Sequence, residues 1–115
     1  MTNAVGIDLG TTNTVVAIIK DGVPTSLADD GGAKLIPSFV SFHPNGGVLV
    51  GRRARERRKI DAENTIYSVK RLIGRRWQSE EVQRAKGLFP FKLKESAEHL
   101  PLVVARGAAY ALHTI

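Results

Sequence analysis

The 115-residue sequence predicts an α+β fold, in which an antiparallel β-meander is followed by a small mixed α+β part. Two runs rich in β-branched residues, 5–9 and 15–19, are separated by a polar turn, as in a hairpin. Asp21-Gly22 is a second turn signal, after which residues 23–27 are expected to return as a third antiparallel strand. From Gly51 onwards, helix formers are mixed with short strand-like runs, which predicts the second part.

The segment after the meander predicts two strands and a basic helix. Residues 38–42 alternate between polar and apolar side chains after Pro37, which suits a half-buried strand. A turn rich in glycine then leads into a strand at residues 48–50. Residues 52–59 are strong helix formers with almost no apolar members, as is typical of a helix that faces solvent.

A second helix is expected after Asn64, with residues 66–73 in it. Asn64 is a suitable cap residue for its start. At helical spacing, Ile66, Val69 and Ile73 would share one face, with Lys70 beside them.

The remaining residues predict a third helix and three strands. Ser79 with Glu80 and Glu81 marks a helix start, because acidic residues are favoured in the first turn. Pro90 ends this helix. Strands are expected at residues 91–94, 100–105 and 109–112.

Composition excludes several classes of protein. With 43% hydrophobic and 24% charged residues, the chain resembles soluble globular proteins. It has no apolar run long enough for a membrane span, and residues 1–4 lack the pattern of a secretory signal, so we expect a cytoplasmic protein with no membrane partner. The absence of cysteine excludes disulfides and thiolate sites, and three scattered histidines do not predict a metal site.

The turn between the first two strands has the composition of a phosphate-binding loop. Glycine and small hydroxyl residues at 10–13 allow several backbone N–H groups to point at one anion. Asp8, just before the turn, is placed to hold a hydrated Mg²⁺, which prefers oxygen ligands. On this evidence alone, an ordinary polar hairpin is the alternative.

Two motifs give the chain a family resemblance. Residues 6–13, Gly-Ile-Asp-Leu-Gly-Thr-Thr-Asn, resemble the first phosphate motif of the heat-shock protein 70 (DnaK-type) chaperones. The resemblance continues through residues 36–40 and 50–51, and strongly through residues 64–75, Asn-Thr-Ile-Tyr-Ser-Val-Lys-Arg-Leu-Ile-Gly-Arg. It covers nearly the whole chain.

The resemblance implies a fold and a domain organisation. It implies that the chain is an amino-terminal fragment of an α/β actin-like (ribonuclease H-like) ATPase domain. Residues 1–37 would form an incomplete part of the core sheet of lobe I with the first phosphate loop, and residues 38–115 a flanking small subdomain. The family's second phosphate loop, adenosine pocket and peptide-binding domain have no counterpart in this sequence.

The resemblance also implies the roles of individual residues. Gly10, Thr11, Thr12 and Asn13 would bind the β- and γ-phosphates of ATP or ADP, while Asp8 would hold Mg²⁺ through water. Lys70 would face the phosphates across the cleft and act in catalysis by orienting the attacking water and stabilising charge. Thr11 is the second candidate catalytic residue. Without this resemblance, Lys70 would be read as a solvated helix lysine.

The implied function is that of an ATP-dependent chaperone, with little or no hydrolysis by this segment alone. The implied partners of the intact protein are unfolded polypeptides, a J-domain co-chaperone and a nucleotide exchange factor. Surface left uncovered by the missing parts is expected to favour self-association.

The alternative is a non-enzymatic basic module that binds nucleic acid or an acidic partner. The net charge is +6, and residues 52–59 contain six cations. These residues lack interleaved aromatic side chains for base stacking, so a solvated helix face is the better interpretation and no specific nucleic acid is expected. An actin-like sugar kinase or filament protein would share the first loop but not the 64–75 motif. Walker and Rossmann glycine motifs are absent from the sequence.

Overall fold

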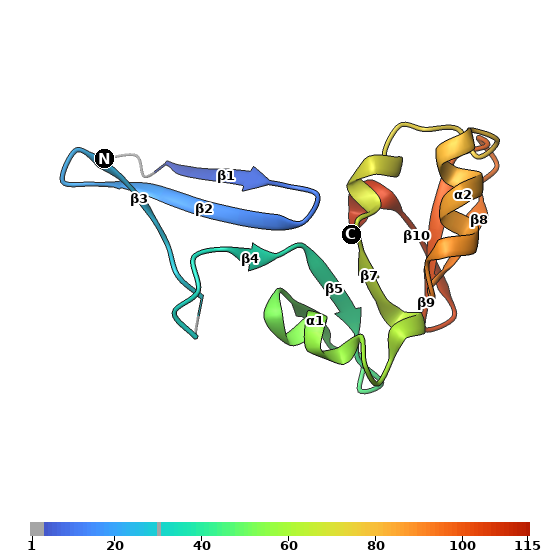
Figure 1. The fold of residues 1–115 in the computed structure, drawn as a ribbon, viewed down its shortest axis with the longest axis horizontal. Helices are drawn as coiled ribbons and strands as arrows, with labels where there is room; N and C mark the ends of the chain where they lie inside the picture. Colours follow the sequence, from blue (N-terminus) through green and yellow to red (C-terminus); the bar gives the residue numbers. More distant parts are fainter. Residues whose placement is uncertain (1–3, 30) are drawn as a thin grey trace.

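The computed structural model describes residues 4–29 and 31–115, in which the strands form three antiparallel sheets (Figure 1). The molecule measures 48 × 29 × 23 Å and has a radius of gyration of 16.0 Å. A compact domain of this length would have a radius of about 13 Å. The difference arises because the β1–β2–β3 sheet projects from the other two sheets (Figure 1).

The projecting sheet contains the predicted meander. Strands β1 (Val5–Leu9), β2 (Asn13–Lys20) and β3 (Val23–Ser26) pair in sequence order, and the short strand β4 (Ile36–Pro37) pairs with the start of β2. Asp21 and Gly22 both have positive φ, at 51° and 78°, as a tight hairpin turn requires. The meander prediction is therefore confirmed. Residues 1–3 and residue 30, all in the predicted first part of the chain (residues 1–37), lie outside the described residues.

The second sheet has β5 (Phe39–Phe42) between β6 (Val48–Val50) and β7 (Thr65–Tyr67). The basic helix α1 (Arg52–Arg57) packs on β5, with Ala54 fully buried and most of its other side chains exposed. The two predicted strands and the solvent-facing helix are thus confirmed.

The prediction of a helix after Asn64 is wrong. A 3₁₀ turn, η1 (Ala62–Asn64), leads into β7, and a second 3₁₀ turn, η2 (Val69–Leu72), follows. Asn64 ends η1 and caps no helix. Pairing with β5 and burial of Ile66 in the core override the helical spacing, because β-branched residues fit a sheet well.

The third sheet follows the helix α2 (Glu80–Leu88), whose cap residue Ser79 accepts a hydrogen bond from the backbone N–H of Val82. The strands are β8 (Lys92–Glu95), β9 (Pro101–Ala105) and β10 (Ala108–Ala111). The helix and all three strands confirm the predictions to within two residues. A last 3₁₀ turn, η3, covers Leu112–Thr114.

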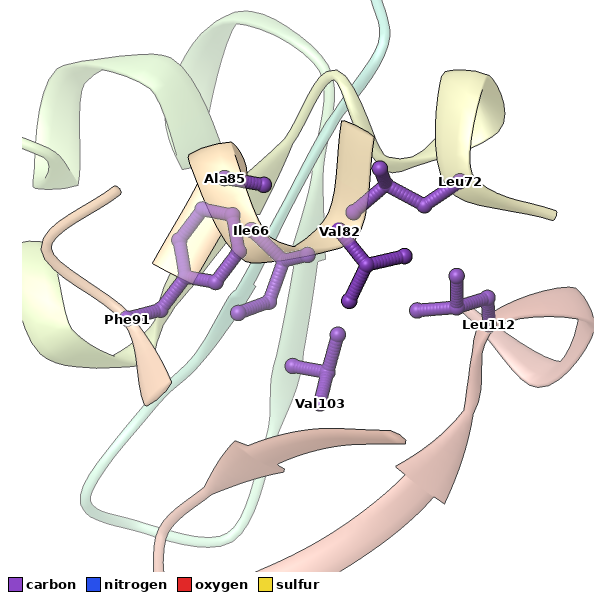
Figure 2. Close-up of a cluster of buried hydrophobic side chains, with 7 residues drawn as sticks. All are labelled: Ile66, Leu72, Val82, Ala85, Phe91, Val103 and Leu112. Carbon is purple, nitrogen blue, oxygen red and sulfur yellow. The ribbon is translucent and has the colours of Figure 1, made fainter. Parts of the chain in front are cut away.

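The main hydrophobic core lies between β7, η2, α2, the third sheet and η3 (Figure 2). Its seven buried side chains are Ile66, Leu72, Val82, Ala85, Phe91, Val103 and Leu112. None of them comes from the β1–β2–β3 sheet. In that sheet Val5, Ile7 and Leu9 are 57%, 67% and 58% exposed, so the meander projects with an open apolar surface.

A network of hydrogen bonds around Asp61 joins the second and third sheets. The Asp61 carboxylate accepts hydrogen bonds from Asn64 at 2.8 Å, from Arg57 at 3.3 Å and from Arg106. Arg106 also donates through Nε to the Phe42 carbonyl, at 2.9 Å. The Asn64 hydrogen bond, followed by those of the arginines, holds the pKa of Asp61 below its usual value.

Candidate functional site

The turn between β1 and β2 is closed by a backbone hydrogen bond. The N–H of Gly10 donates to the carbonyl of Asn13 at 2.9 Å. A Cβ atom on residue 10 would lie 2.4 Å from that carbonyl oxygen, so the turn accepts only glycine there without rearrangement. Thr11 is half-buried and Thr12 is exposed at the tip.

Ser38, at the junction of β4 and β5, holds this turn from one side. Its hydroxyl donates to the Gly10 carbonyl at 2.8 Å and lies 2.9 Å from the Thr14 hydroxyl. Its backbone N–H donates to the Thr12 carbonyl at 2.9 Å. Sequence reasoning gave Ser38 no role at the site. The available signal was its place in the 36–40 segment of the family resemblance.

Lys70 reaches the end of β1 although it follows Leu9 by 61 residues. Its Nζ donates a hydrogen bond to the Leu9 carbonyl at 2.5 Å. Ser68 adopts a left-handed conformation, with φ 59° and ψ 17°, between β7 and η2, the 3₁₀ turn that carries Lys70. The structure therefore brings the lysine next to the turn, from a 3₁₀ turn and not from the predicted helix.

A cleft of about 370 Å³ lies between the β1–β2 sheet and the segment that carries Lys70. This volume is within the usual range for small-molecule sites, roughly 300–1,000 Å³. Much of the lining is apolar and includes Ile7, Leu9 and Val16. The lining side chains with a polar or charged group are Thr11, Thr14, Ser38, Tyr67, Ser68, Lys70 and His113.

The predicted site residues separate into two groups. Gly10, Thr11 and Lys70 line the cleft, whereas Asp8, Thr12 and Asn13 do not. Asp8 is paired with Val15, so strand alternation places it on the sheet face opposite Ile7 and Leu9. Asp8 therefore lies on the face of β1 that is turned away from the cleft.

The residues present provide limited donors for a metal ion. In residues 4–29 and 31–115, no group of three or more histidine or acidic side chains has the arrangement of a metal site. Mg²⁺ usually keeps several waters and takes one or two carboxylates together with substrate phosphates. The exposed carboxylate of Asp8 fits that supporting role, which remains a prediction.

Part of the positive charge of the basic segment is used within the protein. Arg57 bonds Asp61, and the Arg58 guanidinium lies 4.7 Å from the centre of the Tyr67 ring. Two of the six cations of residues 52–59 thus have roles in packing.

In the described part of the chain, no helix has the length and apolarity needed to cross a membrane.

Comparison with known families agrees with the two motifs. A family model described as Hsp70 protein matches residues 4–115. The match includes the β1–β2 turn, Ser38 and the segment that carries Lys70, and it confirms the family resemblance. The chain therefore belongs to the Hsp70 protein family.

Proposed function

We propose that this chain supplies the phosphate-binding wall of an ATP site in an actin-like ATPase that drives an ATP-dependent chaperone. The observation that carries the proposal is the approach of the Lys70 ammonium to the end of β1, 2.5 Å from the Leu9 carbonyl and beside the glycine turn. Hsp70-family proteins use nucleotide and Mg²⁺, and the antiparallel sheets are compatible with that fold.

Each residue of the wall has a defined role in the proposal. The amides and hydroxyls of Gly10, Thr11, Thr12 and Asn13 bind phosphate oxygens. Lys70 leaves the Leu9 carbonyl, contacts the terminal phosphate and orients the attacking water. Bound Mg²⁺ would neutralise phosphate charge, and Asp8 would hold it through a water molecule.

The isolated chain is expected to bind nucleotide weakly. The sequence offers no recognisable counterpart of the adenosine pocket or of the second phosphate loop. Positioning and charge stabilisation supply most of the catalysis in phosphoryl transfer, so half a site should give negligible turnover. Unfolded polypeptides, a J-domain co-chaperone and an exchange factor are the proposed partners of the intact protein, in the cytoplasm.

Titration of the ¹⁵N-labelled chain with Mg-ATP, followed by NMR, tests the proposal. We expect amide shifts at residues 10–13 and near Lys70, with a dissociation constant in the roughly millimolar range. Tripolyphosphate with Mg²⁺ should shift the same amides, whereas adenosine should not. Shifts confined to α1, or no shifts at saturating Mg-ATP, would contradict the proposal. Micromolar affinity with steady turnover would contradict the half-site interpretation.

A further inference from the structure

We propose that Ser38 is a positioning residue for the phosphate-binding turn, and that it sets the direction of the Thr11 and Asn13 amides. This inference rests on the proposed phosphate-binding function of the turn. Ser38 lies 28 residues after Gly10 in the sequence but makes two direct hydrogen bonds to the turn backbone.

The geometry of the peptide bond links Ser38 to the amides. In a trans peptide, the carbonyl of one residue and the N–H of the next point in opposite directions. Ser38 binds the carbonyls of Gly10 and Thr12, so the N–H groups of Thr11 and Asn13 point away from Ser38. The two N–H groups belong to alternate residues of a turn that contains small hydroxyl side chains, as in a backbone anion site.

The Gly10 carbonyl is also the acceptor that a tight turn would use. A two-residue hairpin turn commonly bonds the N–H of its fourth residue to the carbonyl of its first. Here these residues are Asn13 and Gly10, and the Gly10 carbonyl accepts from the Ser38 hydroxyl. Ser38 therefore gives this carbonyl a partner from outside the turn and fixes the direction in which it points.

Thr14 holds the Ser38 hydroxyl in place. The Thr14 and Ser38 hydroxyl oxygens lie 2.9 Å apart in a half-buried setting. The β2–β4 pairing of Thr14 with Ile36 fixes the spacing of the two strands. The clamp thus consists of two hydroxyl side chains, Thr14 on β2 and Ser38 just after β4, and Ser38 makes the contacts to the turn.

NMR of the ¹⁵N-labelled chain tests Ser38 with two variants and a control. We expect Ser38→Ala to shift the Thr11 and Asn13 amide resonances without any ligand, because the peptide groups that carry them lose a hydrogen bond that fixes their orientation. Its dissociation constant for tripolyphosphate with Mg²⁺ should rise by about fivefold, the effect of losing one neutral hydrogen bond. Ser38→Thr keeps a hydroxyl and should restore both properties. Ser26→Ala, in β3 of the same sheet, should match the wild type.

The outcomes separate the two proposals. If the wild type fails to bind tripolyphosphate, the phosphate-binding function fails, while the ligand-free amide shifts still report on the clamp. If Ser38→Ala leaves both amides unchanged, the positioning role is overturned. It is also overturned if Ser38→Thr behaves like Ser38→Ala, because a packing defect at residue 38 would then explain the effect.

Discussion

The ammonium group of Lys70 and the backbone carbonyl of Leu9 form a hydrogen bond across 61 residues of sequence. The carbonyl ends β1, immediately before the glycine turn, so the positive charge lies beside the proposed phosphate position. An ammonium held by a neutral carbonyl can exchange that partner for an anion and gain a stronger, charge-assisted bond. This contact therefore provides a direct test of the proposed site.

Lys70→Met should weaken phosphate binding. The variant keeps a similar side-chain length and loses the charge, so we expect the dissociation constant for Mg-ATP to rise at least fivefold. The wild-type affinity should also fall with added salt more steeply than that of the variant. NMR titration at two salt concentrations measures both effects.

Arg71→Met is the matched control for this prediction. It removes the same unit of charge from the neighbouring exposed position of η2. Its affinity should stay within about twofold of the wild type, because long-range charge effects are screened by salt. Equal losses in the two variants would show that net charge, and not the position of Lys70, governs binding.

The strands, turns and helices that have local sequence signals are predicted correctly. The segment whose conformation depends on distant contacts is not. The Asp21-Gly22 turn and the Ser79 cap are encoded within a few residues, and both were found. The 64–75 segment was misread because its conformation depends on distant β5, where the Thr65 and Ser41 hydroxyls form a buried hydrogen bond of 3.0 Å. The spacing of apolar residues along one segment gives no information about its pairing with a distant strand.

The same distinction applies to the site. The glycine turn and Lys70 are predicted as site residues because each lies in a motif that resembles a known family, and the structure brings them to one cleft. Ser38 was missed as a site residue because its role depends on β4 pairing with β2, a contact between residues more than twenty positions apart. The opposite-face position of Asp8 likewise became visible only with the β1–β2 register.

Acid should selectively weaken the Asp61 network. Its pKa lies below the usual value in the folded protein, so this group stabilises the fold above its unfolded pKa, near 3.8. That contribution is lost as the pH falls through the folded pKa. We expect Asp61→Asn to lower the melting temperature at pH 7 by about 5 °C or more, since Arg57 and Arg106 lose their charged acceptor.

Thermal unfolding by circular dichroism between pH 7 and pH 2.5 checks this prediction. The difference between the wild type and Asp61→Asn should shrink as the pH falls, because the wild-type carboxylate becomes neutral. Asp29, whose pKa is also lowered, chiefly by the Ala33 N–H, titrates in both proteins and cancels in the comparison. A difference that stays constant with pH would exclude a charge-dependent role for Asp61.

Phe91 should be the most costly core truncation. It is 2% exposed, stacks on Phe89 at 4.7 Å and meets the edge of Tyr67. Phe91→Ala should cost about 3–5 kcal/mol. The total stability of a small domain is roughly 5–15 kcal/mol, so the variant should lose a large fraction of it. Urea denaturation measures the loss, and Leu88→Ala, at a side chain 71% exposed, should change stability by no more than about 0.5 kcal/mol.

The chain should self-associate through the outer edge of β1. In the described part of the chain, β1 pairs with β2 on one side and has no strand on the other. Two copies of β1 paired antiparallel about Ile7 would place Val5 of one copy opposite Leu9 of the other. Gly6 would face Asp8, so no like charges would oppose each other. Such an edge, with exposed apolar side chains, favours pairing with a second chain.

Ile7→Lys tests this edge, because it would place two lysines opposite each other at the centre of the pair. Light scattering over a concentration series should show association of the wild type and a shift toward monomer in the variant. Ile60→Lys adds the same charge at a side chain 76% exposed and outside the strands, and it should associate like the wild type. If the wild type stays monomeric at high concentration, the edge does not pair. If Ile60→Lys suppresses association equally, general charge repulsion accounts for the effect and β1 has no special role.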